Sequence, residues 1–298
     1  MSHSHTHETP KTLSRLILAI VINVGIVIFE IILGILSNSL ALISDAFHNI
    51  TDISSMVLGY ISEKTAVKPA NNTKTYGYKK IEFVTAFVNG LILMLATIYI
   101  FYEGILRLFN PTEVVSSQMF YVGIVAVIGN GLATWILSRD SQNNTNMKAV
   151  WLHSLQDALL SLGVIVGAVI IHFTGWNIID PIISIFISLF LAKSIYYLIK
   201  ETVNALIDSV PENIDYEKVR KDLENIKGVE KVSDLHIWLE SSHLPMLSVH
   251  LQIKNLGDLE EILAKAQNLL HKNHEIEHTT IQIVPQNPAK FSNCHHCN

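Results

Sequence analysis

Charged residues are scarce in this sequence. Asp, Glu, Lys and Arg make up 16% of its 298 residues, whereas an average soluble chain carries about 25%. Apolar residues make up 49%, too large a share for a disordered chain. A chain so poor in charge cannot cover a soluble surface, so its composition predicts a membrane protein that lies in a lipid bilayer.

Cysteine and positive charge are also in short supply. The two cysteines, Cys294 and Cys297, lie within the last five residues and cannot cross-link a fold, so nothing indicates an oxidising compartment. The formal net charge is −5, and a surface without excess Lys and Arg does not follow the phosphates of nucleic acid. The sequence therefore excludes a disulfide framework and a nucleic-acid partner.

Long apolar runs, by contrast, fill the first 200 residues. A membrane-spanning helix needs about 20 mostly apolar residues, because it covers roughly 30 Å at about 1.5 Å per residue. The first run is too long for the core of a signal peptide and lacks a cleavage signature. The sequence predicts an all-α, six-helix transmembrane bundle whose spans lie near 14–36, 39–61, 81–106, 117–138, 148–171 and 177–199.

Lys and Arg are unevenly divided among the loops between these runs. They gather before the first run, in 62–80, in 139–148 and at Lys200, while the alternate loops hold almost none apart from Arg107. Loops rich in Lys and Arg stay on the cytoplasmic side of a membrane. Both termini are therefore expected in the cytoplasm.

The chain after residue 200 has the composition of a small soluble domain. Its patterns of alternation and helical period give the order αββαβ, which predicts a ferredoxin-like cytoplasmic α+β domain with two helices on one face of a sheet. The expected helices are 215–226 and 259–271, and the expected strands are 229–239, 244–253 and 279–284. The expected parts are a cytoplasmic tail at 1–13, the transmembrane domain at 14–200, the cytoplasmic domain at 208–286 and a second tail at 287–298.

Ionisable residues interrupt the second and fifth apolar runs. His48 and Asp52 are four residues apart, as are His153 and Asp157, so each pair lies on one face of its helix. Such residues are costly inside a membrane and usually have a function there. Two imidazoles and two carboxylates match the tetrahedral preference of Zn²⁺ and leave no position for a catalytic water.

Two alternatives remain for these residues. The pairs could instead be separate His/Asp hydrogen bonds that hold the helices together, although the repeat of the spacing in two spans favours a metal site. Asp45, three residues before His48, is either a third carboxylate of the site or a residue that orients an imidazole from behind it. We favour the orienting role.

With these motifs, the chain resembles the zinc-transporting branch of the cation diffusion facilitator family. The resemblance rests on the two HxxxD motifs, on six spans with both ends inside, on the αββαβ domain, and on two short segments, 76–82 and Asp180-Pro181. It implies a homodimer in the plasma membrane that moves Zn²⁺ out of the cytoplasm by antiport with protons, with cadmium or cobalt as alternative cargo. It also implies that the transport site consists of His48, Asp52, His153 and Asp157.

The resemblance also implies two features outside the transport site. Lys80 and Asp208 match a Lys and an Asp that form a charge interlock near the membrane surface. His236, His250 and His278 match a metal site of the cytoplasmic domain, where zinc would act as a regulatory ligand. Val284 stands where relatives often carry a carboxylate, and the alternative is that these strand histidines simply face solvent.

Both tails of the chain are rich in metal-binding residues. The first contains His3, His5 and His7, and the second contains Cys294, His295, His296 and Cys297. Short terminal segments rarely hold ligands in a fixed geometry. We expect weak metal collection there rather than an ordered site.

Two other functions compete with transport. A membrane metal sensor would bind the ion without moving it, and the sequence excludes this function poorly. An intramembrane metalloenzyme is disfavoured, because the chain has no HExxH motif and four protein ligands would fill the position that a reacting water needs.

Overall fold

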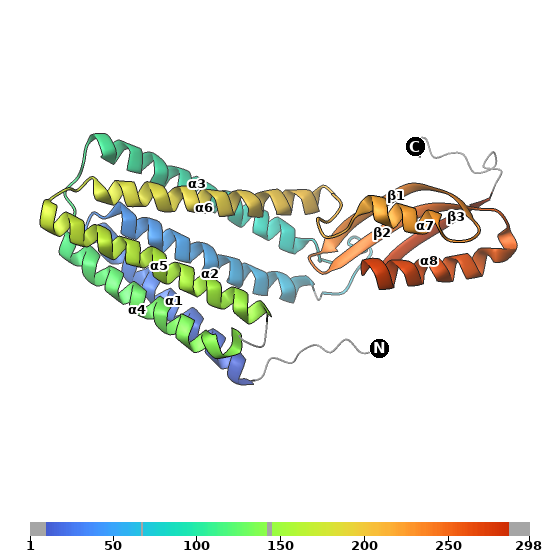
Figure 1. The fold of residues 1–298 in the computed structure, drawn as a ribbon, viewed down its shortest axis with the longest axis horizontal. Coiled ribbons are helices and arrows are strands. Elements are labelled where there is room, and N and C mark those ends of the chain that lie inside the picture. Colours follow the sequence, from blue (N-terminus) through green and yellow to red (C-terminus); the bar gives the residue numbers. More distant parts are fainter. Residues whose placement is uncertain (1–9, 67, 142–144, 286–298) are drawn as a thin grey trace. The chain divides into compact units, whose positions relative to one another are not determined.

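A computed structural model describes residues 10–66, 68–141 and 145–285. The chain folds as two units (Figure 1). The first unit is formed by Met1–Val57 and Val88–Tyr197, and the second by Leu58–Phe87 and Leu198–Asn298.

Six long helices coincide with the six predicted apolar runs. Helix α1 packs against α4, and α4 packs against α5. The structure confirms that each run is a helix, with ends that differ from the predicted limits by up to seven residues. The helices are α1 Pro10–Leu36, α2 Leu40–Ala66, α3 Ile81–Phe109, α4 Ser116–Ser141, α5 Thr145–Thr174 and α6 Ile179–Leu206.

Three of these helices are long and apolar enough to cross a membrane. Among the described residues they are α3, the Leu155–Thr174 part of α5, and α6. The described apolar parts of α1 and α4, Val21–Leu36 and Ser116–Leu132, are shorter, and α2 is interrupted by its ionisable residues. The prediction of six spans is thus confirmed for three, and for the others it stays a prediction.

The first unit has the polarity expected of a protein surrounded by lipid. Large apolar side chains such as Leu95, Phe173 and Phe186 are more than half exposed, while Glu30 and Asp180 are fully buried. A soluble protein would bury the apolar groups and expose the acidic ones. This inversion indicates an integral membrane protein.

A carboxylate on α6 fixes the start of α2. Asp180 accepts hydrogen bonds from Ser39 Oγ at 2.6 Å and from the backbone N–H groups of Leu40 and Ala41 at 2.8 and 3.2 Å. These N–H groups belong to the first turn of α2, where backbone N–H groups have no hydrogen-bond partner within their own helix. The contact therefore sets where α2 begins, and with it the depth of the ionisable residues further along.

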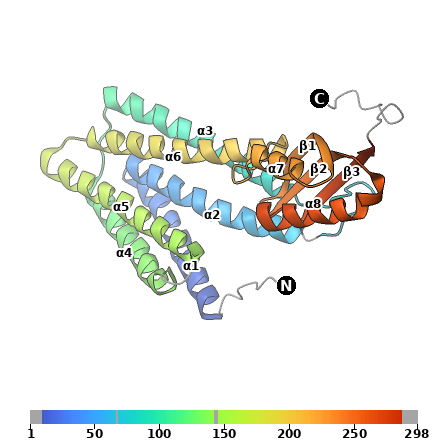
Figure 2. The same ribbon diagram turned by 45° about the vertical axis from the view of Figure 1, so that its right-hand side comes forward.

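The second unit contains the predicted αββαβ domain (Figure 2). Strands β1 and β2 are antiparallel, β2 and β3 are parallel, and the strand order is β1-β2-β3. Helices α7 and α8 contact each other and share one apolar core with the sheet, so both lie on the same face. The elements are α7 Tyr216–Glu224, β1 Val229–Ser241, β2 Leu244–Ile253, a 3₁₀ turn Leu256–Asp258, α8 Leu259–His274 and β3 His278–Pro285.

The ends of α7 follow the local sequence. Asp215 accepts a hydrogen bond from Lys218 N at 3.1 Å, as expected of the predicted N-terminal cap. The helix ends at Glu224, two residues earlier than predicted, and Gly228 then adopts a φ of +102° in the turn to β1. Only glycine takes that conformation without strain.

Candidate metal centre

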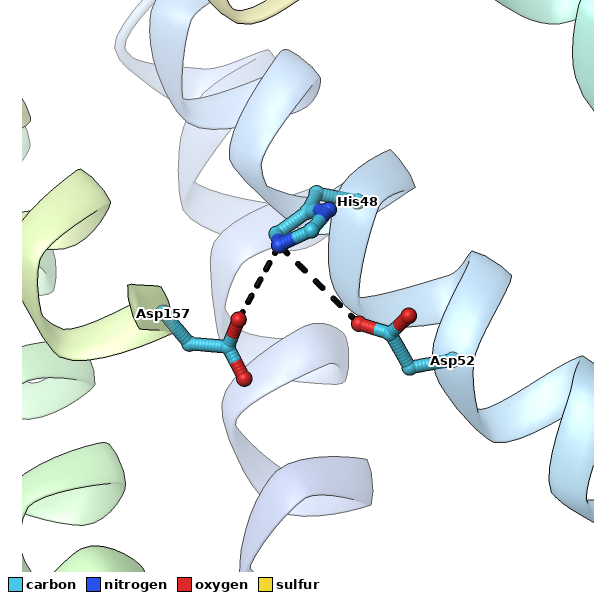
Figure 3. A group of neighbouring side chains, drawn as sticks. All are labelled: His48, Asp52 and Asp157. Carbon is cyan, nitrogen blue, oxygen red and sulfur yellow. Dashed lines mark hydrogen bonds and ion pairs between the residues drawn. The ribbon is translucent and has the colours of Figure 1, made fainter. Parts of the chain in front are cut away.

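Three of the four predicted ligands lie together in the first unit (Figure 3). His48 and Asp52 project from one face of α2, and Asp157 reaches them from α5. His48 Nε2 lies 3.0 Å from Asp157 Oδ1 and 4.0 Å from Asp52 Oδ2. One ligand atom from each residue lies within 4.8 Å of the others; we call this group the His48 cluster.

The fourth predicted ligand, His153, lies one helical turn before Asp157. Four residues correspond to about 6 Å along a helix axis, on the same face. The side chain of His153 lies outside what the structure describes. The backbone of α5 therefore places His153 on the face that carries Asp157, and its role as a ligand stays a prediction.

The His48 cluster is shielded from solvent on most sides. His48 is 4% exposed and Asp157 is 2% exposed, and the ring of Phe190 from α6 lies edge-on to His48 with ring centroids 6.3 Å apart. Asp52 is partly exposed, with 19% of its side chain accessible. Asp52 is therefore the least enclosed residue of the cluster.

The spacing of the ligand atoms suits a small divalent cation. A tetrahedral ion with ligands at about 2.0–2.2 Å separates neighbouring ligand atoms by about 3.3–3.6 Å. The two distances from His48 Nε2, 3.0 and 4.0 Å, lie on either side of this value. A buried carboxylate such as that of Asp157 is costly without a compensating charge, so a dication would stabilise the arrangement.

Asp45 lies outside the His48 cluster. Its Oδ2 accepts a hydrogen bond from Ser161 Oγ of α5 at 2.9 Å, and its carboxyl group lies near that of Glu30 of α1. Asn49 Nδ2 donates to Glu30 Oε2 at 3.0 Å. The polar network behind the cluster thus joins α1, α2 and α5.

Glu30 is the main buried residue that the sequence analysis missed. It lies in the first apolar run, where an acidic residue is costly. The second and fifth runs were singled out because an ionisable residue inside an apolar run usually has a function, and the same argument applies to Glu30. Glu30 could therefore have been found from the sequence.

In the second unit, two of the three predicted histidines lie beside one aspartate. Asp234 Oδ1 lies 3.0 Å from His236 Nε2, and Asp234 Oδ2 lies 3.5 Å from His250 Nε2. Asp234 adopts a φ of +53° where the register of β1 and β2 shifts, between Ser233 and His236. This irregularity turns its carboxylate toward both imidazoles, and no pattern in the sequence indicated it.

His278 lies apart from that pair. It is the first residue of β3 and stands opposite Met246, whereas His250 stands opposite Gln282. Four residues along a strand correspond to about 13 Å. The ring of His278 instead contacts Tyr76, with centroids 6.4 Å apart, so the structure does not gather the three predicted histidines at one point.

The segments of the second unit are tied together by polar contacts. Lys80 Nζ lies 2.5 Å from Asp208 Oδ1, with 33% and 56% of the two side chains exposed. Glu82 accepts a hydrogen bond from the backbone N–H of Ser242. Nearby, burial raises the pKa of the Glu240 carboxyl group, and the positive charges of Lys80 and Lys79 oppose that rise.

The two tails cannot be assessed in the same way. The histidines at positions 3, 5 and 7 and the residues Cys294, His295, His296 and Cys297 lie outside the described residues. Their predicted role in metal collection stays a prediction.

Two family models together match almost the whole chain. Residues 16–207 match the cation efflux transmembrane domain, and residues 211–286 match the cytoplasmic domain of cation efflux proteins. The boundary between the two matches falls just after α6.

The chain is also similar to named proteins over nearly its full length. It is 36% identical over 287 residues to the cadmium, cobalt and zinc/H(+)-K(+) antiporter of Bacillus subtilis, with 95% of this chain and 90% of that protein covered. It is 36% identical over 288 residues to the zinc transporter ZitB of Pectobacterium atrosepticum, with 96% and 90% covered. It is 35% identical over 284 residues to the metal cation efflux system protein CzcD of Cupriavidus metallidurans, with 95% and 90% covered.

Proposed function

Because the chain belongs to the cation efflux family, we propose that it exports Zn²⁺ from the cytoplasm in exchange for protons. The relatives named above are an antiporter, a transporter and an efflux protein rather than enzymes. The name of the Bacillus subtilis relative adds cadmium and cobalt as candidate cargo. These names also favour transport over the sensor and metalloenzyme alternatives.

The observation that carries the proposal is the His48 cluster. It joins one nitrogen and two carboxylate ligands from two helices of the membrane domain. His153 is proposed as the fourth ligand, which would give the two-nitrogen, two-oxygen set that suits Zn²⁺. A closed set of four protein ligands holds an ion without offering a place for catalysis.

Coupling to protons follows from the chemistry of the ligands. A bound imidazole must be neutral and a bound carboxylate ionised, so the metal displaces protons as it binds. Protons that arrive from the other side of the membrane compete for the same groups and release the metal. Exchange of Zn²⁺ for H⁺ at the His48 cluster is the proposed transport step.

The packing of the helices supports movement as rigid groups. A Cβ atom at Gly167 of α5 would lie 2.3 Å from Ile183 Cδ1 of α6, and one at Gly123 of α4 would lie 2.7 Å from Ile165 Cγ1 of α5. Glycine thus lets these helix backbones approach closely. Closely packed helices tend to rock together around a site near the middle of the membrane.

The remaining features of the proposal concern the whole assembly. We propose that the protein lies in the plasma membrane with both termini in the cytoplasm and forms a homodimer, which the match to the cytoplasmic domain of cation efflux proteins supports. The proposed parts remain 1–13, 14–200, 208–286 and 287–298. Zinc is also proposed as a regulatory ligand of the cytoplasmic domain, which the pairing of His236 and His250 around Asp234 supports.

The decisive experiment measures zinc flux in sealed vesicles that contain the purified protein and an imposed pH gradient. We expect the wild-type protein to move Zn²⁺ against the proton flow, and Asp157→Asn to abolish this flux. Loss of residues that merely orient ligands typically costs 10- to 100-fold in metal affinity, so loss of a ligand is expected to cost at least that.

A matched control is Glu103→Gln, because Glu103 lies on α3 and pairs with Arg107 rather than with the His48 cluster. This variant is expected to transport zinc at a rate close to the wild type. Undiminished flux in a well-folded Asp157→Asn protein would remove Asp157 from the transport site. Zinc binding without any flux in the wild type would favour the sensor.

A further inference from the structure

Two buried carboxyl groups lie behind the His48 cluster and have no part in the proposed transport step. Glu30 of α1 is 0% exposed and Asp45 of α2 is 1% exposed. The two carboxyl groups lie close enough to act on each other electrostatically. We call them the Glu30–Asp45 pair.

The hydrogen bonds of the pair leave one oxygen of each residue unfilled. Glu30 Oε2 accepts from Asn49, and Asp45 Oδ2 accepts from Ser161. The other two oxygens, Glu30 Oε1 and Asp45 Oδ1, are buried and have no donor among the described residues. Each carboxyl group thus has one oxygen that lacks the donor that a buried acceptor needs.

A single proton between the two groups supplies the missing donor. Two ionised carboxylates cannot hydrogen bond each other, since both only accept. Two like charges that share a buried site repel strongly, and such pairs commonly hold one proton in common. The burial of both groups and the lack of a donor to one oxygen of each therefore favour a single proton held by the pair.

We propose that the Glu30–Asp45 pair is a proton-binding site, which releases its proton when a divalent cation occupies the His48 cluster. This inference rests on the proposed function. Asp45 lies three residues before His48 on α2, and residues with that spacing are neighbours on a helix surface. The positive charge of the metal therefore acts on the pair at close range.

Among the residues whose side chains the structure describes, few other charges face the pair. Asp157 of α5 and His48 of α2 act on it electrostatically, and both belong to the His48 cluster. Helix α4 packs against α1, but residues 116–135 of α4 include no acidic or basic side chain. The occupancy of the cluster is therefore the main electrostatic change that the pair senses.

The release balances in charge and atoms. The pair changes from one negative charge to two as its proton leaves for water, and the site gains two positive charges from the metal. Loss of this proton lowers by one unit the positive charge that the membrane domain gains when the metal binds. When the metal leaves, a proton from the opposite side of the membrane restores the pair.

Infrared spectroscopy of the purified protein in detergent tests the proposal directly. The metal-free wild-type protein is expected to show the C=O stretching band of a protonated carboxyl group, which fades when zinc is added. Glu30→Gln and Asp45→Asn should each remove this band, because an amide donates a hydrogen bond to the remaining carboxylate without a titrating proton. Glu103→Gln is the control and should leave the band in place.

The second measurement counts protons released when zinc binds in a weakly buffered solution. Glu30→Gln is expected to release about one proton fewer per zinc ion than the wild type. Wild-type protein that lacks the band without metal, keeps it with zinc bound, or releases no more protons than Glu30→Gln would overturn the proposal. Wild-type vesicles that bind but do not transport zinc would overturn transport alone, since a band that responds to zinc would still support the pair.

Discussion

His48 supplies the nitrogen ligand that the structure describes in the cluster, and this atom favours one class of metal. Imidazole suits Zn²⁺, whereas carboxylates suit Mn²⁺ and other ions that prefer oxygen. The two carboxylates beside His48, by contrast, suit the ions that prefer oxygen ligands. The numbers of nitrogen and oxygen ligands are therefore expected to determine which metal ion the site prefers.

We predict that His48→Asp shifts transport from Zn²⁺ toward Mn²⁺ and Cd²⁺. The variant replaces a nitrogen ligand by an oxygen and tolerates higher coordination numbers. Competition between the metals in the vesicle flux assay measures this change, with Glu103→Gln as the control. An unchanged order of transported metals would show that His48 does not bind the ion.

At the level of single residues, the sequence predicted which ionisable side chains lie together better than it predicted what surrounds them. The spacing of His48 and Asp52 predicts a shared face of α2, and Asp157 indeed meets that face. Helical period alone cannot show that Asp45 turns toward Glu30 and Ser161, since this depends on which helices become neighbours. The sequence also did not predict that Asp234 lies between His236 and His250, because this depends on a local irregularity of β1.

Among the helices, the junction between α6 and α2 depends on one carboxylate. Asp180 accepts hydrogen bonds from three donors at the start of α2, two of which are backbone N–H groups. Without it these N–H groups would be buried without a partner. The position of His48 and Asp52 along α2 therefore depends on a residue that lies about 130 residues away in the chain.

We predict that Asp180→Ala lowers the thermal stability of the protein in detergent. The loss should be on the order of 2–5 kcal/mol, because hydrogen bonds to a charged group are lost and buried donors are left unfilled. Asp180→Asn keeps one acceptor oxygen and should recover part of the stability. Equal melting temperatures for Asp180→Ala and the wild type would contradict this role.

Strand β1 contains a carboxyl group that disfavours ionisation. Burial raises the pKa of Glu240 above its ordinary value of 4.5, against the opposing effect of Lys80 and Lys79. The folded protein then binds more protons than the unfolded chain between 4.5 and the raised pKa, so the free energy of unfolding falls as the pH rises through that interval. We predict that Glu240→Gln raises the melting temperature above about pH 7 and has little effect near about pH 4.

Glu261 on α8 provides a control with the opposite sign. Its hydrogen bond to Lys265 lowers the pKa of its carboxyl group. Its contribution to stability is therefore present at higher pH and lost as the pH falls through the lowered pKa. Glu261→Gln should lower or leave unchanged the melting temperature at neutral pH, and a rise equal to that of Glu240→Gln would contradict the interpretation.

The sequence predicted the elements well, because each follows from a short-range pattern. Hydropathy gave the six long helices, and alternation gave the order of the small sheet. The start of α7 at Asp215 was predicted from its capping chemistry, whereas the Asp180 cap was not, because its partners lie 139 to 141 residues away.

On the scale of the whole molecule, the ion pair of Lys80 and Asp208 joins segments that are 128 residues apart. An exposed pair is worth only about 0–1 kcal/mol, but reversal of one charge adds repulsion from Glu240 or from neighbouring lysines. We predict that Lys80→Asp and Asp208→Lys each reduce zinc flux by roughly five-fold or more. The double exchange should restore part of the flux.

A matched control exchanges Arg220 and Glu224, an exposed ion pair on α7 with N–O distance 3.1 Å. Since this pair lies within one helix, its reversal should leave the flux unchanged. Single variants of Lys80 or Asp208 with wild-type flux would show that their contact has no part in transport.

The resemblance to a family pointed to this long-range pair, whereas composition and periodicity did not. Lys80 belongs to a run of positive charges that orientation in the membrane already explains. Asp208, with a φ of +59° after α6, is equally compatible with a simple helix end. Only the folded structure gives the distance between them.

The second unit is built from two separate stretches of chain, Leu58–Phe87 and Leu198–Asn298. During synthesis, Lys80 and Glu82 leave the ribosome 128 and 160 residues ahead of their partners Asp208 and Ser242. Contacts between such distant residues form late in folding. A chain that stops short of residue 198 therefore lacks both of these contacts, and the first stretch can complete its packing only after the second has been made.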